Sequence, residues 1–279
     1  MSYFKNFGLD REPFSTSPDP SFFFLTKTHK TALTRLEISL RLKRGLNVVF
    51  GDVGTGKTTL SRTLIRNFTD DDDFEFHMIF DPGYKSEYQF LYALSKLFHI
   101  QEKAHSTTGS KYAIENFLFN KNLHRNKTVV LIIDEGQKLS SESLEILRVF
   151  LNYETNEHKL LQLIIFSQLE LLPRLKVMPN FLDRISLKYV LEPLNAEEAR
   201  SMIHFRLCKA GCSNPETLIE ESAIELIYEN SGGFPRKITY ICRNAVERAI
   251  MNDQTFITCE SIHNLINEDL LLNERRIFA

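Results

Sequence analysis

The sequence predicts an α/β fold in which helices cover both faces of a five-stranded parallel sheet, followed by a smaller all-helical domain. Three observations lead to this prediction. Short apolar runs alternate with amphipathic segments as far as Pro193. After Pro193 only segments with helical spacing remain. Between the first apolar run and the first amphipathic segment lies a glycine-rich loop, residues 51–58, in the position that joins a strand to a helix.

The elements follow one another in a regular order. Strands are expected at 46–50, 74–80, 129–133, 161–166 and 186–191, and core helices at 59–66, 86–98, 112–123, 141–155 and 168–175. The run Val129–Ile133 is apolar at every position, as in a strand buried on both faces of a parallel sheet. Later helices are expected at 196–210, 220–230, 235–252 and 259–268.

Three parts of the chain follow from this order. Residues 1–45 are expected to form an N-terminal segment, rich in proline and phenylalanine, that wraps over the core and leads into a helix from about His29. Residues 46–193 are expected to form the sheet domain, and residues 194–279 a helical lid.

The glycine-rich loop carries the first chemical signal, because it matches the phosphate-binding pattern G-x-x-x-x-G-K-[ST]. Its backbone N–H groups and the following helix N-terminus are suited to cradle phosphates. Lys57 is expected to bridge the β- and γ-phosphates, and Thr58 to supply its hydroxyl to Mg²⁺. The expected nucleotide-binding residues are Gly51, Asp52, Val53, Gly54, Thr55, Gly56, Lys57, Thr58 and Thr59.

Two acids follow the buried run that ends at Ile133. The carboxyl end of such a strand opens toward the phosphate loop in this class of fold. Asp134 is therefore expected to hold Mg²⁺ through water, and Glu135 to orient or deprotonate the attacking water. A glycine-rich match alone could mark a plain turn, but the loop and the acidic strand end together predict a site for ATP and Mg²⁺.

Two further polar residues are candidates for contact with the γ-phosphate. Gln168 follows the strand at 161–166 and is expected to act as a sensor of phosphate or water, with a helix-capping role as the alternative. Arg236 follows Gly232–Pro235, and a proline in the first turn of a lid helix would direct this arginine toward the nucleotide. A solvated helix arginine is the alternative.

Composition limits the other possibilities. The formal charge of −2 gives no general reason to expect nucleic-acid binding, although a local basic face remains compatible with DNA as a partner. No apolar run approaches the roughly 20 residues of a membrane-spanning helix, and the N-terminus lacks the apolar core of a signal peptide. We expect a cytoplasmic protein or one peripheral to the inner membrane.

These residues together resemble the AAA+ ATPases, and more narrowly the ExeA or GspA family of secretion-pathway ATPases, with MshM-like pilus proteins close by. The matching segments fall in family order and cover nearly the whole chain: Phe4–Leu9, Pro13–Phe14, Ser17–Pro20, Gly51–Thr58, Ile132–Leu139, Leu160–Ile165 and Gly232–Arg236. One departure is Asp81, which closes the second strand where relatives often carry asparagine.

The resemblance implies a P-loop AAA+ core with a C-terminal all-helical lid, and ATP bound between the subunits of a homo-oligomeric ring. Arg184 matches the position of the arginine finger that reaches the γ-phosphate of a neighbour. A structural surface role for Arg184 stays open, and Arg174 is a rival for the finger. The resemblance also implies that residues near Phe14 and His29 line the adenine pocket.

The resemblance further implies an ATPase that converts ATP and water to ADP and phosphate. Hydrolysis would drive oligomerisation or remodelling in the assembly of a secretion or type IV pilus apparatus, with a protein of that machine as partner. One alternative is a DNA-associated ATPase similar to the MuB and TnsC transposition regulators. A second is a nucleotide-gated scaffold with little turnover.

Overall fold

The computed structural model describes residues 3–15, 20–101, 106–155 and 158–277. Residues 17–19 of the expected opening signature lie outside the described residues. The described chain forms two compact units. Unit 1 comprises residues 1–26, 54–56 and 192–279, and unit 2 comprises residues 27–53 and 57–191.

Unit 2 is built on a sheet of five parallel strands among the described residues: β1 (Leu46–Gly51), β2 (Phe74–Ile79), β3 (Thr128–Ile133), β4 (Leu161–Ser167) and β5 (Ile185–Leu191). Their order across the sheet is β2-β3-β4-β1-β5. Strands β1, β3 and β4 are buried at every residue because they lie inside the sheet and are covered on both faces. Edge strand β5 alternates between half-buried and exposed residues until its buried last residue. The predicted five-stranded parallel sheet is confirmed.

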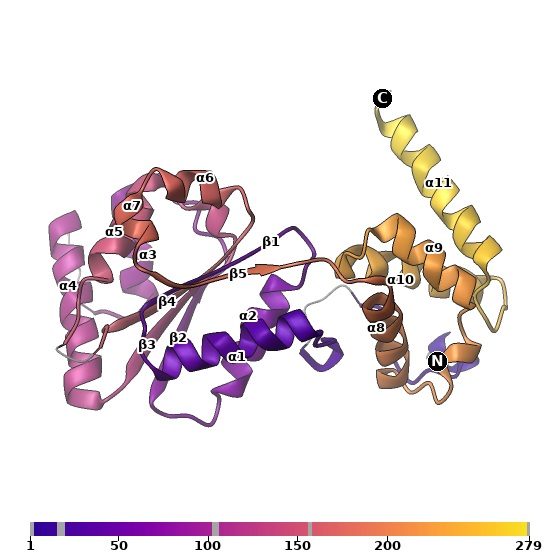
Figure 1. The fold of residues 1–279 in the computed structure, drawn as a ribbon, viewed down its shortest axis with the longest axis horizontal. Helices are drawn as coiled ribbons and strands as arrows, with labels where there is room; N and C mark the ends of the chain where they lie inside the picture. Colours follow the sequence, from indigo (N-terminus) through magenta and orange to yellow (C-terminus); the bar gives the residue numbers. More distant parts are fainter. Residues whose placement is uncertain (1–2, 16–19, 102–105, 156–157, 278–279) are drawn as a thin grey trace. The chain divides into compact units, whose positions relative to one another are not determined.

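Helices cover both faces of this sheet (Figure 1). Helices α1 (Lys27–Arg41) and α2 (Lys57–Asn67) lie along one face. Alternate residues of β3 pack on the other face into a core with helices α3 (Glu87–Leu97) and α5 (Ser141–Phe150). Because β1, β3 and β4 are parallel, their carboxyl ends lie at the same end of the sheet. The loops that follow these ends carry the polar residues.

Helix α4 (Thr107–Phe119) begins five residues earlier than the sequence predicts. The Ser106 side chain caps it by accepting the Gly109 N–H at 3.0 Å, so residues 107–111 are helical as well. A π-helical turn (Asn120–His124) extends the helix.

Two other core helices differ from their predicted bounds. Helix α5 ends at Phe150, and the chain then turns so that Glu154 and Lys159 form an antiparallel bridge. The helix expected at 168–175 is instead α6 (Leu171–Lys176), followed by α7 (Pro179–Leu182). The apolar spacing predicts that helices occur in these regions, but hydrogen bonds in the flanking turns determine the residues at which each helix begins and ends.

Unit 1 is helical, as the sequence predicts. It contains α8 (Ala196–Lys209), α9 (Glu221–Ser231), α10 (Pro235–Met251) and α11 (Cys259–Ile277), with short 3₁₀ turns at Tyr3–Phe7, Pro20–Phe22 and Pro215–Thr217. Asn195 and Glu198 form a reciprocal capping box that starts α8.

The N-terminal segment divides differently from the expected 1–45 boundary. Phe7, Leu9 and Phe14 bury their side chains in the core of unit 1, against α8 and α10 residues such as Ile203 and Ile238. Residues 27–45 instead belong to unit 2. The aromatic residues of the first segment therefore supply core to the helical unit.

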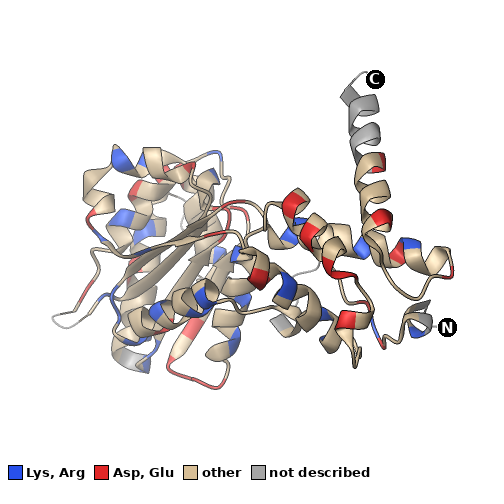
Figure 2. Cartoon of the chain, turned by 45° about the vertical axis from the view of Figure 1, so that its right-hand side comes forward, with Lys and Arg blue, Asp and Glu red and all other residues tan. Residues whose placement is uncertain are grey.

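Charged residues are dispersed. Figure 2 shows Lys and Arg interspersed with Asp and Glu on both units in that view. Among the described residues, none of the helices combines the length and apolar character needed to cross a membrane.

Candidate nucleotide site

Three polar segments follow the carboxyl ends of strands in the sheet; all of their residues belong to unit 2 except residues 54–56 of the phosphate loop. The phosphate loop follows β1, the acidic pair Asp134–Glu135 follows β3, and Gln168 follows β4. Strand β4 lies between the other two, with Phe50 beside Ser167 and Ile133 beside Ile165. The strand order thus brings residues 57, 134 and 168 together although they are far apart in the sequence.

Lys57 is the first residue of α2 and is only 6% exposed. Its ammonium group donates to the carbonyl oxygens of Gly51 at 2.7 Å and Asp52 at 2.9 Å, so it lies across the loop. Burial lowers the pKa of Lys57, while the nearby charges of Glu135, Asp134 and Asp52 oppose that shift. A desolvated cation at a helix N-terminus is suited to bind phosphate.

The loop backbone explains why two glycines are needed. Gly54 and Gly56 have φ angles of 85° and 97°, in the left-handed region that a side chain disfavours. Thr55 between them is fully buried. Thr59 is half-buried in the first turn of α2, and Asp52 and Val53 are exposed. The loop is therefore a compact turn with accessible residues on its outer side.

Thr58 and Asp134 form the pair expected to hold Mg²⁺. The Thr58 hydroxyl donates to Asp134 Oδ2 at 2.6 Å, and Asp134 is 3% exposed. A hydroxyl and a carboxylate are hard oxygen ligands, the type that Mg²⁺ prefers. Because the structure brings these two donors together from α2 and β3, the residues fit this ion.

Glu135 has a constrained backbone. Its φ and ψ angles are 53° and 40°, a left-handed conformation that is uncommon for a residue with a side chain. Its N–H donates to Asp134 Oδ1 at 3.0 Å. The Asp134 carboxylate thus contacts Thr58 with one oxygen and the Glu135 backbone with the other.

A 3₁₀ turn (Gly136–Lys138) follows Glu135 and supplies a residue to which the sequence reasoning gave no role. Gln137 Nε2 donates to Glu135 Oε2 at 2.5 Å. Gln137 Oε1 accepts the Gln168 N–H at 3.1 Å and the Ser167 hydroxyl at 3.4 Å. Gln168 is half-buried. Its role as a phosphate sensor stays a prediction. The only sequence signal for Gln137 was its position two residues after Glu135, the residue predicted to activate water.

Two further contacts tie the turn to the rest of unit 2. Lys138 Nζ forms an ion pair with Asp81 at 2.9 Å, and this contact, with a further one from the Gly83 N–H, lowers the pKa of the Asp81 carboxyl. Arg174 Nη1 donates to the Gln137 carbonyl at 3.0 Å, and Nη2 donates to the Leu139 carbonyl. Arg174, the rival candidate for an arginine finger, therefore holds this turn in its own chain.

Gly136 gives a stability prediction. A Cβ atom at this position would overlap the Ile165 side chain and lie 3.2 Å from the Phe166 carbonyl oxygen and from Ser167 Cβ. Gly136→Ala is therefore expected to lower the free energy of unfolding by about 1–3 kcal/mol through overpacking. Denaturant unfolding measures this loss, and Gly83→Ala is the control, because its Cβ would meet only the Asp81 side chain. Equal stability of the two variants would contradict the prediction.

Arg184 lies at the other end of the sheet from the phosphate loop, where β5 begins, immediately before the first residue of that strand. Its guanidinium donates to Asn152 Oδ1 at 3.1 Å from Nε and to the Asn180 carbonyl at 2.6 Å from Nη1. The side chain is half-buried. The structure does not bring Arg184 to the phosphate loop of its own chain.

Arg236 belongs to unit 1, together with residues 54–56 of the loop. Within that unit its backbone N–H donates to the Gly54 carbonyl at 3.3 Å, and its side chain is exposed. The contact of the Arg236 side chain with nucleotide stays a prediction. Phe14 and His29 are both buried, Phe14 in unit 1 and His29 in α1 of unit 2, and their place in an adenine pocket also stays a prediction.

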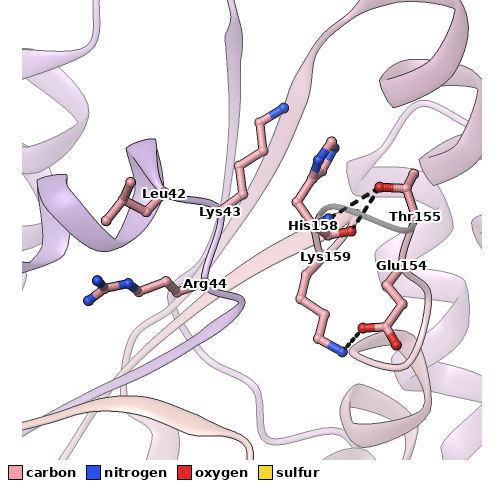
Figure 3. A pocket seen from close by; sticks show the side chains of 7 residues that line it. All are labelled: Leu42, Lys43, Arg44, Glu154, Thr155, His158 and Lys159. Carbon is pink, nitrogen blue, oxygen red and sulfur yellow. Dashed lines mark hydrogen bonds and ion pairs between the residues drawn. The ribbon is translucent and has the colours of Figure 1, made fainter.

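A separate hollow lies at the amino-terminal edge of the sheet (Figure 3). Lys159 pairs with Glu154 there, and Thr155 and His158 bond to each other. The hollow is lined by Leu42, Lys43, Arg44, Glu154, Thr155, His158 and Lys159. None of these is a predicted nucleotide-binding residue.

Part of the chain matches a known domain family. Residues 40–175 match the AAA domain family, and that match includes the phosphate loop and the acidic pair. General secretion pathway protein A of Aeromonas hydrophila is 31% identical over 272 residues, which covers 97% of this chain and 47% of that protein. The chain thus spans about half the length of this curated relative.

Solved structures share the fold. The ORC2 protein of Aeropyrum pernix, solved as ADPNP–ADP complexes, has a TM-score of 0.70 at 18% identity and covers 93% of this chain and 72% of that one. The ORC1 protein of Aeropyrum pernix in complex with DNA has a TM-score of 0.68 at 16% identity, with coverages of 92% and 69%. The parallel sheet, the helical C-terminal part and these matches all agree with one family. Residues 40–175 therefore form an AAA domain, and the chain is similar to general secretion pathway protein A over nearly its whole length.

Proposed function

We propose that the protein is an ATPase that converts ATP and water to ADP and phosphate. The observation that supports this most is the 2.6 Å contact of Thr58 with Asp134, beside the buried ammonium group of Lys57 and the carboxylate of Glu135. Phosphoryl transfer to water requires a cation near the phosphates, ligands for a metal ion and a group that activates the water. These residues are candidates for all three. Release of phosphate by the purified chain with ATP and Mg²⁺ tests the proposal.

Each residue has a separate role in this proposal. The loop N–H groups and Lys57 bind the β- and γ-phosphates. Thr58 and Asp134 would hold Mg²⁺, which neutralises charge on the phosphates when bound. Glu135 orients the attacking water and accepts its proton. Gln168 follows β4, beside the phosphate-loop strand, and would sense the γ-phosphate, and Arg236 would do so from the helical lid.

The position of Arg184 supports a homo-oligomer with shared sites. Strands β1 and β5 pair in parallel, Leu46 with Ile185 and Gly51 with Leu191, with one register shift after Leu46. At a rise of about 3.3 Å per residue, Arg184 therefore lies roughly 20 Å along the sheet from the phosphate loop. One side chain does not span that distance. Head-to-tail packing of copies, as in a ring, would place the Arg184 edge of one copy against the loop edge of the next.

This arrangement predicts complementation between two inactive variants. Arg184→Ala and Lys57→Ala chains are each expected to be inactive, but their 1:1 mixture should regain up to about a quarter of the wild-type turnover. At a mixed interface the Arg184→Ala chain supplies an intact phosphate loop, and its neighbour supplies Arg184. Phosphate release after co-assembly measures the recovery. The matched control mixes Glu135→Gln chains with Lys57→Ala chains. Both changes affect the half of the shared site that holds the phosphate loop, so no mixed interface is intact.

Two results would contradict the shared site. One is an Arg184→Ala chain with wild-type turnover. The other is a mixed oligomer, verified by affinity tags on both variants, that stays inactive.

The proposed cellular role follows from the relative named for the general secretion pathway. ATP-dependent oligomerisation or remodelling would serve assembly of a secretion or type IV pilus apparatus, with a protein of that machine as partner. The site would then lie in the cytoplasm or at the inner face of the membrane, where ATP is present. Proteins that co-purify with the Glu135→Gln chain in the presence of ATP identify this partner.

DNA is the alternative partner, and one solved structure with this fold is a complex with DNA. Likeness at 16% identity supports the fold alone, and the interspersed charges in Figure 2 do not favour a nucleic-acid interface. Turnover stimulated by DNA, with binding that weakens steeply as salt rises, would favour a transposition-type regulator. Nucleotide binding with very slow turnover would favour the scaffold alternative.

A further inference from the structure

We propose that Gln137 is a positioning residue that fixes the carboxylate of Glu135 and couples it to the end of β4. The proposal rests on the proposed function, because it assigns a role beside the water-activating carboxylate. Its basis is the pair of contacts that one amide group makes with two segments of the site.

The contacts define the orientation of the Gln137 amide. Nε2 donates to Glu135 Oε2 at 2.5 Å, and Oε1 accepts the Gln168 N–H at 3.1 Å. An ionised carboxylate only accepts hydrogen bonds and a backbone N–H only donates. The reverse orientation of the amide would lose both contacts, so Gln137 joins Glu135 to Gln168 in one arrangement.

The turn that carries Gln137 is held from three sides. Arg174 donates to the Gln137 carbonyl at 3.0 Å, and Lys138 pairs with Asp81 at the end of β2. Gly136 packs so closely on β4 that a Cβ would overlap Ile165. Because backbone and side chain are both anchored, Gln137 can hold its partner within a narrow range of positions.

Glu135 needs such a partner because its own backbone is unusual. The left-handed conformation of Glu135 directs the side chain away from a regular strand path, and the Asp134 carboxylate holds only its N–H. The bond from Gln137 engages one carboxylate oxygen, Oε2. A neutral donor fixes the direction of the carboxylate and leaves its negative charge available to accept a proton.

Position 137 offers a substitution that separates the two contacts. Gln137→Glu keeps an oxygen that accepts the Gln168 N–H and removes the donor to Glu135. We expect kcat for ATP hydrolysis to fall about 10- to 100-fold, while the Kd for ATP stays near the wild-type value, because the carboxylate loses its orientation but the phosphate contacts remain. Gln137→Met, which removes both contacts at similar volume, is expected to lower kcat as much.

The split between kcat and Kd is a readout that a merely structural role would not give. Loss of packing around the turn would disturb the phosphate contacts as well and would raise the Kd for ATP. Loss of the Gln137 donor should instead lower kcat and leave the Kd near its wild-type value.

The matched control is Gln89→Glu, a change at an exposed glutamine on α3 that should alter neither kcat nor the Kd for ATP. Wild-type kcat in both Gln137 variants would overturn the positioning role, and so would a Kd for ATP that rises as far as kcat falls. If Gln137→Glu fails to fold, as judged by loss of ATP binding, Gln137→Met alone decides through its kcat. Failure of the proposed function is distinguishable, because the wild-type chain itself would then release no phosphate from ATP.

Discussion

Glu135→Gln is expected to lower kcat for ATP hydrolysis by about 10²- to 10⁴-fold while ATP still binds. Glutamine has nearly the same shape as glutamate but does not accept a proton from water at neutral pH. The phosphate-binding groups, Lys57 and Thr58, are not changed. The protein should therefore accumulate in its ATP-bound state, which phosphate release and the nucleotide content of the purified protein both measure.

The control for this variant is Glu142→Gln, an exposed glutamate at the start of α5. It removes one carboxylate seven residues away and should leave kcat unchanged. Wild-type turnover by Glu135→Gln would show that another group activates the water. Loss of ATP binding by Glu135→Gln would instead show that Glu135 supports the phosphate site itself.

The sequence predicts the sheet and the core of this site well, for a physical reason. A strand buried on both faces tolerates few polar side chains, so β1, β3 and β4 are visible as apolar runs. In the phosphate loop Gly54 and Gly56 have positive φ angles, which favour glycine, and Asp134 is buried directly after its strand. Local constraints of this kind can be recognised in the amino-acid sequence.

Other features depend on contacts between distant segments and cannot be recognised in this way. The position of β4 between β1 and β3 is one such feature, because apolar runs predict strands but not their order across the sheet. Gln137 is one polar residue in a polar turn, and only its bonds to Glu135 and Gln168 distinguish it. Phe7 and Phe14 belong to a segment that was expected to wrap over another part of the chain. Apolar side chains without a period indicate burial but not which part buries them, and here it is the core of unit 1.

Lys57→Ala is expected to raise the Kd for ATP by about 10²-fold or more, the largest loss of binding among these variants. Lys57 is only 6% exposed, and removing one partner of a buried charged contact typically costs about 2–5 kcal/mol. About 3 kcal/mol already gives a 10²-fold change in Kd. Calorimetric titration with ATP and Mg²⁺ measures the change. Lys96→Ala, at an exposed position on α3, is the matched control and should bind as the wild type does.

The same burial makes ATP binding dependent on pH in a definite direction. Since burial lowers the pKa of Lys57, its ammonium group in the free protein loses a proton at lower pH than an exposed lysine does. ATP binding favours the charged form, so affinity should decline as pH rises through this lowered pKa, and it should be constant below it. In Lys57→Ala this alkaline decline should disappear, since the titrating group is gone. A decline that persists in Lys57→Ala would assign it to another group and contradict the role of the Lys57 charge.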